Sequence, residues 1–264
     1  MLKYEDITQD MEFHEWFKYE PHDAQYIRFC EDNPSAIAAG YKIADVYQSF
    51  ATARASLLFS LEENYGDLAK TDDDLFVRAM FVQNAIFQYA ICEDLSWQVA
   101  WAYILPADID FLMNNEYEKM SKECNRDNLI EQLDCGIAQH SADAEKIKEI
   151  IVKFDNDEDI KKFRTLYNYL KHRGNIHVEG LGNEDEYLMA MINGKAVKIL
   201  SRESYSLEQL QDLSWNYHRK FETYFSELIA AIIPDDFTYN TVSLEDLLVS
   251  NLKMSYAQYK NKKE

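Results

Sequence analysis

The sequence predicts an all-α protein, a multi-helix bundle that carries one β-hairpin. The chain of 264 residues contains only 7 Gly and 4 Pro, which is little turn-forming material for the many short strands of a sandwich or barrel. Apolar residues make up 47% of the chain and aromatic residues 14%, as is typical of a packed, aromatic-rich core. Long segments repeat apolar side chains every three or four positions, which is the period of an α-helix.

The first third of the chain predicts an arm followed by a long helix. Residues 1–34 are acidic and aromatic without a sustained period, and we expect an arm or short helices packed on the body. Pro34 and Ser35 then open a helix whose apolar positions continue to residues 64–66, where it should end.

The most apolar segment predicts a buried central helix over residues 71–105. A capping-box pattern opens it and Pro106 should end it. Charged residues interrupt the segment, so it lacks the ~20 uninterrupted apolar residues of a membrane span. The chain also shows no signal-peptide pattern, and its four cysteines are far apart without metal-binding spacing. We therefore expect a cytoplasmic protein with reduced thiols and no membrane partner.

The next segments predict shorter helices. Helical patterns cover residues 108–124, 127–139, 141–154 and 157–173. In the last of these, one apolar stripe is formed by Ile160, Phe163, Tyr167 and Leu170. Gly174 is well placed to adopt the left-handed conformation that closes this helix.

The C-terminal third predicts a hairpin and two further helices. Two strand-like runs joined by Asn193-Gly194 indicate a β-hairpin near residues 186–201. A capping box formed by Ser206 and Gln209 precedes a long helix, and a last helix should start at Ser243. No linker or repeat divides the chain, so we interpret residues 35–264 as a single helical domain.

One segment, residues 161–178, is basic within a strongly acidic chain. It contains no acidic residue, whereas the whole chain carries 27 basic and 47 acidic residues and a formal charge of −20. That charge repels phosphate backbones at long range, but short-range contacts in a basic cluster can still hold an anion. The alternative is a solvated helix face whose cations pair with acidic neighbours. The cations are Lys161, Lys162, Arg164, Lys171 and Arg173, with His172 and His177 among them.

The run from Phe163 to His177 resembles the HEPN superfamily, notably its clostridial-type subgroup with an Asn-x-x-Lys-His-Arg-Gly run. The resemblance covers roughly residues 140–264. It implies a helical bundle, often a homodimer, that cuts RNA without a metal ion through an Arg/His pair. Other members are noncatalytic partners of nucleotidyltransferases, and the family context is toxin–antitoxin or defence.

Carried onto this chain, the resemblance makes Arg173 and His177 the catalytic pair and RNA or a nucleotide the ligand. Three residues separate them, one fewer than the shortest spacing in the family. The residues that would bind the ligand are Lys171, His172, Asn175, Asn168 and Arg164. These residue types suit RNA cleavage, because an imidazole moves protons near neutral pH and a guanidinium neutralises charge growing on a phosphate. The cleavage that the resemblance implies requires neither a metal nor a cofactor.

Three alternatives stay open at this point. Arg164 and His172, eight residues apart on one helix face, could form a second Arg/His pair. A zinc site from His172, His177 and Glu179 would lack a fourth ligand. Finally, the chain could be a noncatalytic helical interaction or scaffold module in which the Arg/His pair is structural. Phosphate-binding glycine loops and the nucleophile elbow of α/β-hydrolases are absent from the sequence.

Overall fold

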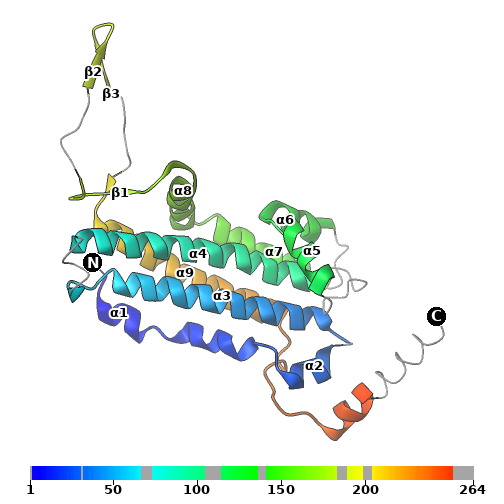
Figure 1. Cartoon of the computed structure of the whole chain (residues 1–264). Helices are drawn as coiled ribbons and strands as arrows, with labels where there is room; N and C mark the ends of the chain where they lie inside the picture. The colour runs from blue at the N-terminus through cyan, green and yellow to red at the C-terminus, as the bar shows by residue number, and fades with distance from the viewer. Residues whose placement is uncertain are drawn as a thin grey trace. The chain divides into compact units, whose positions relative to one another are not determined.

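The computed structural model describes residues 2–30, 32–66, 73–104, 114–135, 141–182, 189–198 and 204–251. These residues form an all-α protein with two small pairs of strands (Figure 1). The helices of the first half are α1 (Tyr4–Gln9), the 3-10 helix η1 (Glu12–Tyr19), α2 (Asp23–Phe29), α3 (Pro34–Phe59), α4 (Asp74–Ile104), α5 (Asn114–Glu123) and α6 (Arg126–Cys135). There follow α7 (Ser141–Asp155), α8 (Glu158–Arg173), β1 (His177–Val178), β2 (Met189–Ile192), β3 (Lys195–Lys198), β4 (Ser204–Tyr205) and α9 (Leu207–Ile232).

The described residues belong to two compact units, each assembled from separate parts of the sequence. Unit 1 consists of Met1–Met11, Ser49–Ile91 and Phe154–Phe221. Unit 2 consists of Glu12–Gln48, Cys92–Lys153 and Glu222–Glu264. The helices α3, α4, α7 and α9 therefore each contribute residues to both units. The single helical domain over residues 35–264 and its boundary with an arm stay predictions.

The predicted helices are present, with shifted ends. Helix α3 begins at the expected Pro34 but ends at Phe59, before the expected residues 64–66. Helix α4 begins at Asp74, where the Asp73 carboxylate accepts the N–H of Leu75 at 2.9 Å. The predicted end of that helix at Pro106 lies outside the described residues.

The predicted hairpin is confirmed. Strands β2 and β3 are antiparallel, with Met189 opposite Lys198 and Ile192 opposite Lys195. Between them Asn193 and Gly194 have φ of 52° and 73°, the positive values that a type I′ turn requires. Its predicted flanks, residues 186–188 and 199–201, lie outside the described part.

The predicted capping box at the start of α9 and the predicted helix start at Ser243 are also confirmed. The backbone N–H of Ser206 donates to Gln209 Oε1 at 2.9 Å, and the N–H of Gln209 donates back to Ser206 Oγ at 3.2 Å. Ser243 makes the same reciprocal pair with Asp246, at 2.9 and 3.0 Å, and a helical segment covers residues 244–251. Each cap satisfies amide groups that a helix start leaves without intrahelical partners.

Helix α4 is long and apolar enough to cross a membrane by length and composition. Its most apolar window has a mean hydropathy of 1.3, and 44% of that window is buried in the structure. The central helices of many bundles share this property, because a helix covered on all sides needs apolar residues on every face.

An aromatic core holds unit 1 together. The Phe163 ring of α8 stacks on Tyr217 of α9 with centroids 3.9 Å apart. The ring centroid of Tyr89 in α4 is 6.3 Å from that of Phe163 and 5.6 Å from that of Tyr217. The ring centroids of Phe50 in α3 and Phe221 are 5.6 Å apart. All five side chains are almost completely buried. Stacked and edge-on rings at these distances add to the hydrophobic gain from burial, so they fix α8 against α4 and α9.

The start of α8 is fixed by a lysine. The Asp157 side chain caps the helix by accepting the N–H groups of Asp159 at 2.9 Å and Ile160 at 3.3 Å. Lys220 of α9 donates to Asp157 at 2.6 and 2.7 Å and to Asp159 at 2.8 Å. This contact with Lys220 lowers the pKa of Asp157. The ammonium group therefore ties the first turn of α8 to α9.

The N-terminal residues pack into the units. In unit 1, Arg54 donates to the carbonyl oxygens of Ile7 at 2.6 Å and Asp10 at 3.1 Å, and so holds the end of α1 against α3. In unit 2, the Trp16 indole of η1 lies edge-on to Phe225, with centroids 4.8 Å apart. These contacts account for the aromatic character of the N-terminal segment.

A buried histidine lies beside the core of unit 1. The Nδ1 atom of His218 is 2.8 Å from the Tyr89 hydroxyl, and its Nε2 is 3.3 Å from a carboxylate oxygen of Asp10. Its ring stacks on Phe50 at 4.4 Å and on Trp215 at 4.6 Å. Burial lowers the pKa of His218, and the opposing effect of Asp10 does not cancel it.

We expect unit 1 to lose stability as the pH falls below the ordinary histidine pKa of 6.5. Below that pH the unfolded chain binds a proton at His218 that the folded state resists, because burial, with smaller effects of Arg54 and Arg219, disfavours the imidazolium. One such proton costs at most about 1.4 kcal/mol per pH unit. Urea unfolding between about pH 7 and pH 5.5 measures the slope. A His218→Asn variant with the same slope as the wild type would disprove this assignment.

Candidate functional site

The basic segment begins within α8, whose inner face is apolar. Its buried side chains are Ile160, Phe163, Leu166 and Leu170. The sequence pattern placed Tyr167 on this stripe instead of Leu166. Tyr167 is half-buried at the margin, and its ring meets Phe87 of α4 edge-on at 5.8 Å. The outer face of α8 is therefore free to carry charged residues.

Gly174 ends α8, as predicted, but not in the left-handed helical conformation. Its φ is 113° and its ψ is −170°, a region that is almost restricted to glycine. The chain therefore leaves the helix in an extended direction. It enters β1, where His177 pairs with Ser204 and Val178 with Tyr205 in a parallel register.

We call residues 171–177 the α8–β1 corner. Lys171, His172, Arg173 and Asn175 are exposed there, and His177 is half-buried. Because Ile176 and Val178 are buried on either side, the His177 ring faces away from the apolar interior, as alternation along a strand requires. The predicted catalytic pair is thus at the surface, on either side of Gly174.

The cations nearer the start of α8 are paired with carboxylates. These pairs are Lys161–Glu158 at 2.9 Å, Lys162–Asp159 at 3.7 Å and Arg164–Asp155 at 3.6 Å. The Asp155 side chain is buried, so Arg164 acts as its counter-ion. For this half of the basic segment, the interpretation as a salt-bridged helix face holds.

The cations of the α8–β1 corner have a different environment. Within the part of the chain that the structure describes, neither His172 nor Arg173 pairs with a carboxylate. The Lys171 ammonium lies 5.7 Å from the ring centroid of Tyr167, a cation–π contact that leaves its charge in place. Asn168 is exposed one turn before Lys171 and His172. Positive charge therefore remains available to an anion at the end of α8.

The structure brings Arg173 and His177 to one corner without joining them. No hydrogen bond links the two side chains within the described residues. Their Cα atoms are at most about 14 Å apart, because four residues of extended chain span no more than that. In the alternative Arg/His pair, Arg164 and His172, the arginine already forms an ion pair with Asp155 at 3.6 Å.

Metal ligands do not gather at this corner. Among the described residues, the side chains of His172, His177 and Glu179 do not form a group close enough to hold a metal ion.

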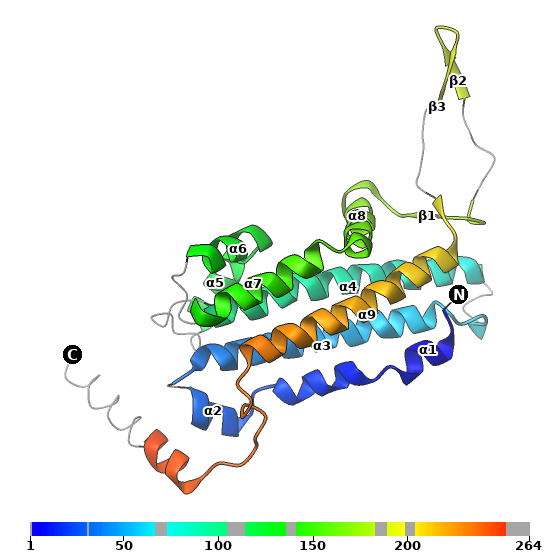
Figure 2. The ribbon, with the colours of Figure 1, turned by 180° about the vertical axis from the view of Figure 1, so that it is seen from behind.

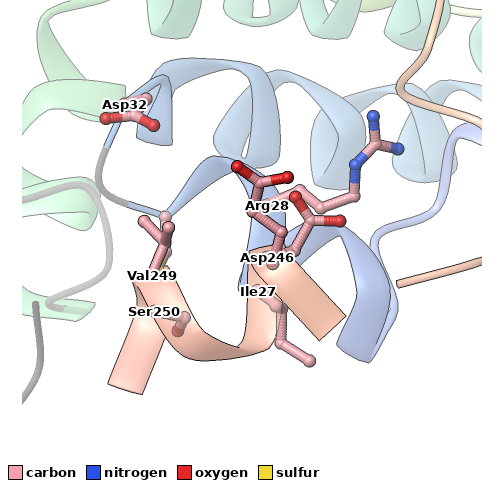
Figure 3. Close-up of a pocket in the computed structure, with 8 residues that line it drawn as sticks. Ile27, Arg28, Asp32, Asp246, Val249 and Ser250 are labelled. Carbon is pink, nitrogen blue, oxygen red and sulfur yellow. The ribbon is translucent and has the colours of Figure 1, made fainter. Parts of the chain in front are cut away.

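A small pocket lies in unit 2, between α2 and the helical segment 244–251 (Figure 3). Its volume is about 220 Å³, below the usual range for small-molecule sites. The Arg28 guanidinium at its edge is already engaged, because it donates to the Asp236 backbone oxygen at 2.8 Å and to the Asp236 carboxylate. The rest of the lining is Ile27, Cys30, Asp32, Glu245, Asp246, Val249 and Ser250.

Two contacts that hold Ile176 and His177 in place were not predicted from the sequence. The backbone N–H of Ile176 donates to Gln83 Oε1 of α4 at 3.3 Å, and β1 pairs with β4. Both contacts join residues that are far apart in the sequence. A two-residue strand also carries no alternation pattern that could reveal it.

The HEPN resemblance rests on the run from Phe163 to His177, whose residues are placed in α8, at the corner and in β1. Comparison of the whole chain with protein-family models, with curated proteins and with solved structures gives no match.

Proposed function

We propose that the α8–β1 corner binds the phosphate backbone of RNA and that Arg173 and His177 cleave the strand there without a metal ion. The observation that carries the proposal is the contrast along α8. Its first three cations are paired with carboxylates, whereas Lys171, His172 and Arg173 are exposed without such partners among the described residues. In a chain of net charge −20, an exposed cation cluster is a feature that a phosphate would recognise.

The chemistry would proceed by transfer within the RNA strand. The His177 imidazole takes the proton of a ribose 2′-hydroxyl, and the 2′-oxygen attacks the adjacent phosphorus. The bond from phosphorus to the 5′-oxygen breaks, and that oxygen takes a proton from the imidazolium. The products are a 2′,3′-cyclic phosphate and a 5′-hydroxyl. Arg173 neutralises the charge that grows on the non-bridging oxygens during this step.

Binding at the corner is tested with Arg173→Ala. We expect wild-type protein to bind single-stranded RNA in EDTA at low salt, and the variant to bind it about tenfold more weakly, because a charge-assisted contact to phosphate is lost. Lys162→Ala is the matched control, since Lys162 is an exposed cation of the same helix already paired with Asp159. Fluorescence anisotropy with a labelled 2′-O-methyl oligonucleotide, which has no free 2′-hydroxyl and cannot be cleaved, measures both. Equal losses in the two variants would show that only general charge is involved.

A noncatalytic interaction module is the second candidate function. The helical segment 244–251 of unit 2 supports it, because Leu244 is 80% exposed and Leu248 is 62% exposed one turn later. Adjacent exposed leucines are unusual on a surface that meets only water. Intact RNA in EDTA under all conditions, together with no RNA binding, would favour this alternative.

A further inference from the structure

Two large apolar side chains are exposed near the start of α4. Phe76 and Met80 are each 51% exposed, although α4 is otherwise rich in buried residues. They are four positions apart on one helix, so their side chains lie next to each other on the same face. Together they form an apolar shelf, which we call the Phe76–Met80 shelf.

The shelf lies beside the α8–β1 corner. Gln83 follows Phe76 by seven positions and Met80 by three, so it lies on the same stripe of α4. Its side chain accepts the N–H of Ile176, the residue between Asn175 and His177. From the rise of a helix, Met80 is about 5 Å and Phe76 about 10 Å along the axis from Gln83.

A second contact supports this placement. A Cβ atom at Gly180, just after β1, would lie 3.0 Å from Leu75 Cδ2 at the start of α4. Both views of the ribbon also place β1 beside the N-terminal end of α4 (Figures 1 and 2). An apolar shelf and an exposed cation cluster are therefore neighbours within unit 1.

We propose that the Phe76–Met80 shelf stacks an unpaired base of a single-stranded RNA whose phosphate is held at Arg173. This inference rests on the proposed function and names its substrate class. Single-stranded nucleic acid offers phosphates and exposed base faces together, and proteins bind it with cations beside aromatic side chains. A duplex hides its base faces in the stack and would not use the shelf.

Charge favours one direction for the bound strand. Asp73 and Asp74 lie at the start of α4, just before Phe76, and their carboxylates repel phosphate. Lys171 and Arg173 lie at the end of α8 and attract it. The base on the shelf thus belongs to a nucleotide whose backbone runs toward α8 and away from residues 73–74.

The test compares two uncleavable ligands of equal length and charge, a 2′-O-methyl oligo(A) and the corresponding abasic oligomer. We expect wild-type protein to bind oligo(A) about tenfold more tightly, because stacking on an aromatic ring contributes that order of affinity. Phe76→Ala should remove the preference and Phe76→Trp should keep it. The matched control is Phe59→Ala. Phe59 is 54% exposed in the same unit, and its ring centroid is 5.4 Å from that of Phe81. Phe81 follows Met80 on α4 and therefore projects about 100° away from it around the helix axis, so Phe59 lies off the shelf.

The outcomes separate this inference from the function on which it rests. If Arg173→Ala weakens binding while Phe76→Ala keeps the preference for oligo(A), the shelf is not a stacking platform and the proposed function stands. If Phe76→Ala removes the preference while Arg173→Ala changes nothing, the shelf holds a base and the phosphate site is wrong. If wild-type protein binds neither oligomer, both proposals fail.

Discussion

Replacing Phe163 by alanine is expected to destabilise unit 1 by about 3–5 kcal/mol, the usual cost of emptying a buried aromatic site. The side chain is completely buried, stacks on Tyr217 at 3.9 Å and meets Tyr89 edge-on. Its loss leaves a cavity where α8 meets α9, and the surrounding rings cannot collapse without breaking their own contacts. Urea unfolding followed by circular dichroism measures the free energy of unfolding.

Two variants on the same helix calibrate that loss. Phe163→Leu keeps most of the buried volume and should cost about 1–2 kcal/mol. Tyr167→Ala removes a half-buried ring that contacts only the margin of the core, through Phe87, and should also cost far less than Phe163→Ala. A Phe163→Ala protein that unfolds at nearly the wild-type urea concentration would show that the aromatic core does not hold α8 in place.

Replacing His177 by alanine is expected to slow RNA cleavage by about 10²–10⁴-fold, the range for loss of a general acid–base group. His177 lies outside the Phe163 core and is half-buried, so the variant should remain folded. RNA binding should change little, because the proposed mechanism has the imidazole act on the 2′-hydroxyl and Arg173 hold the phosphate. Initial rates of single-stranded RNA cleavage in EDTA, with detection of the 2′,3′-cyclic phosphate end, measure the effect.

The other histidine of the corner is tested in the same assay with His172→Ala. His172 is exposed, five residues before His177, on the last turn of α8. If His172→Ala abolishes cleavage and His177→Ala does not, the reacting imidazole is that of His172, which would require a different arginine or lysine beside it. Cleavage that survives both substitutions would remove the ribonuclease proposal and leave only RNA binding.

Much of the secondary structure could be predicted because its causes are local. Proline at the start of α3, the side-chain cap at Ser206 and the Asn193-Gly194 turn act within a few residues of their positions in the chain. Helix ends were less predictable. The apolar period of α3 continues past Phe59, but the helix itself ends there. Burial and backbone conformation are separate requirements, and only the first leaves a clear period in the sequence.

The candidate site was only partly predictable. The sequence identified the cations of segment 161–178, but it could not tell the paired ones from the exposed ones. Arg164 pairs with Asp155, a carboxylate nine residues earlier, while Arg173 meets no carboxylate among the described residues. Pairing depends on which helix faces meet, and that is set by packing rather than by composition.

The order of amino acids was enough to predict that this chain is helical, where its hairpin turns and which segment is basic. These properties follow from backbone preferences, from periodicity and from side-chain chemistry, all of which act over short stretches of chain. The contact of Gln83 with Ile176, which puts the exposed Phe76 and Met80 beside the α8–β1 corner, came instead from the packing of distant helices. Those residues are about a hundred positions apart, and the core of unit 1 brings them together through apolar burial, which carries no directional signal in the sequence.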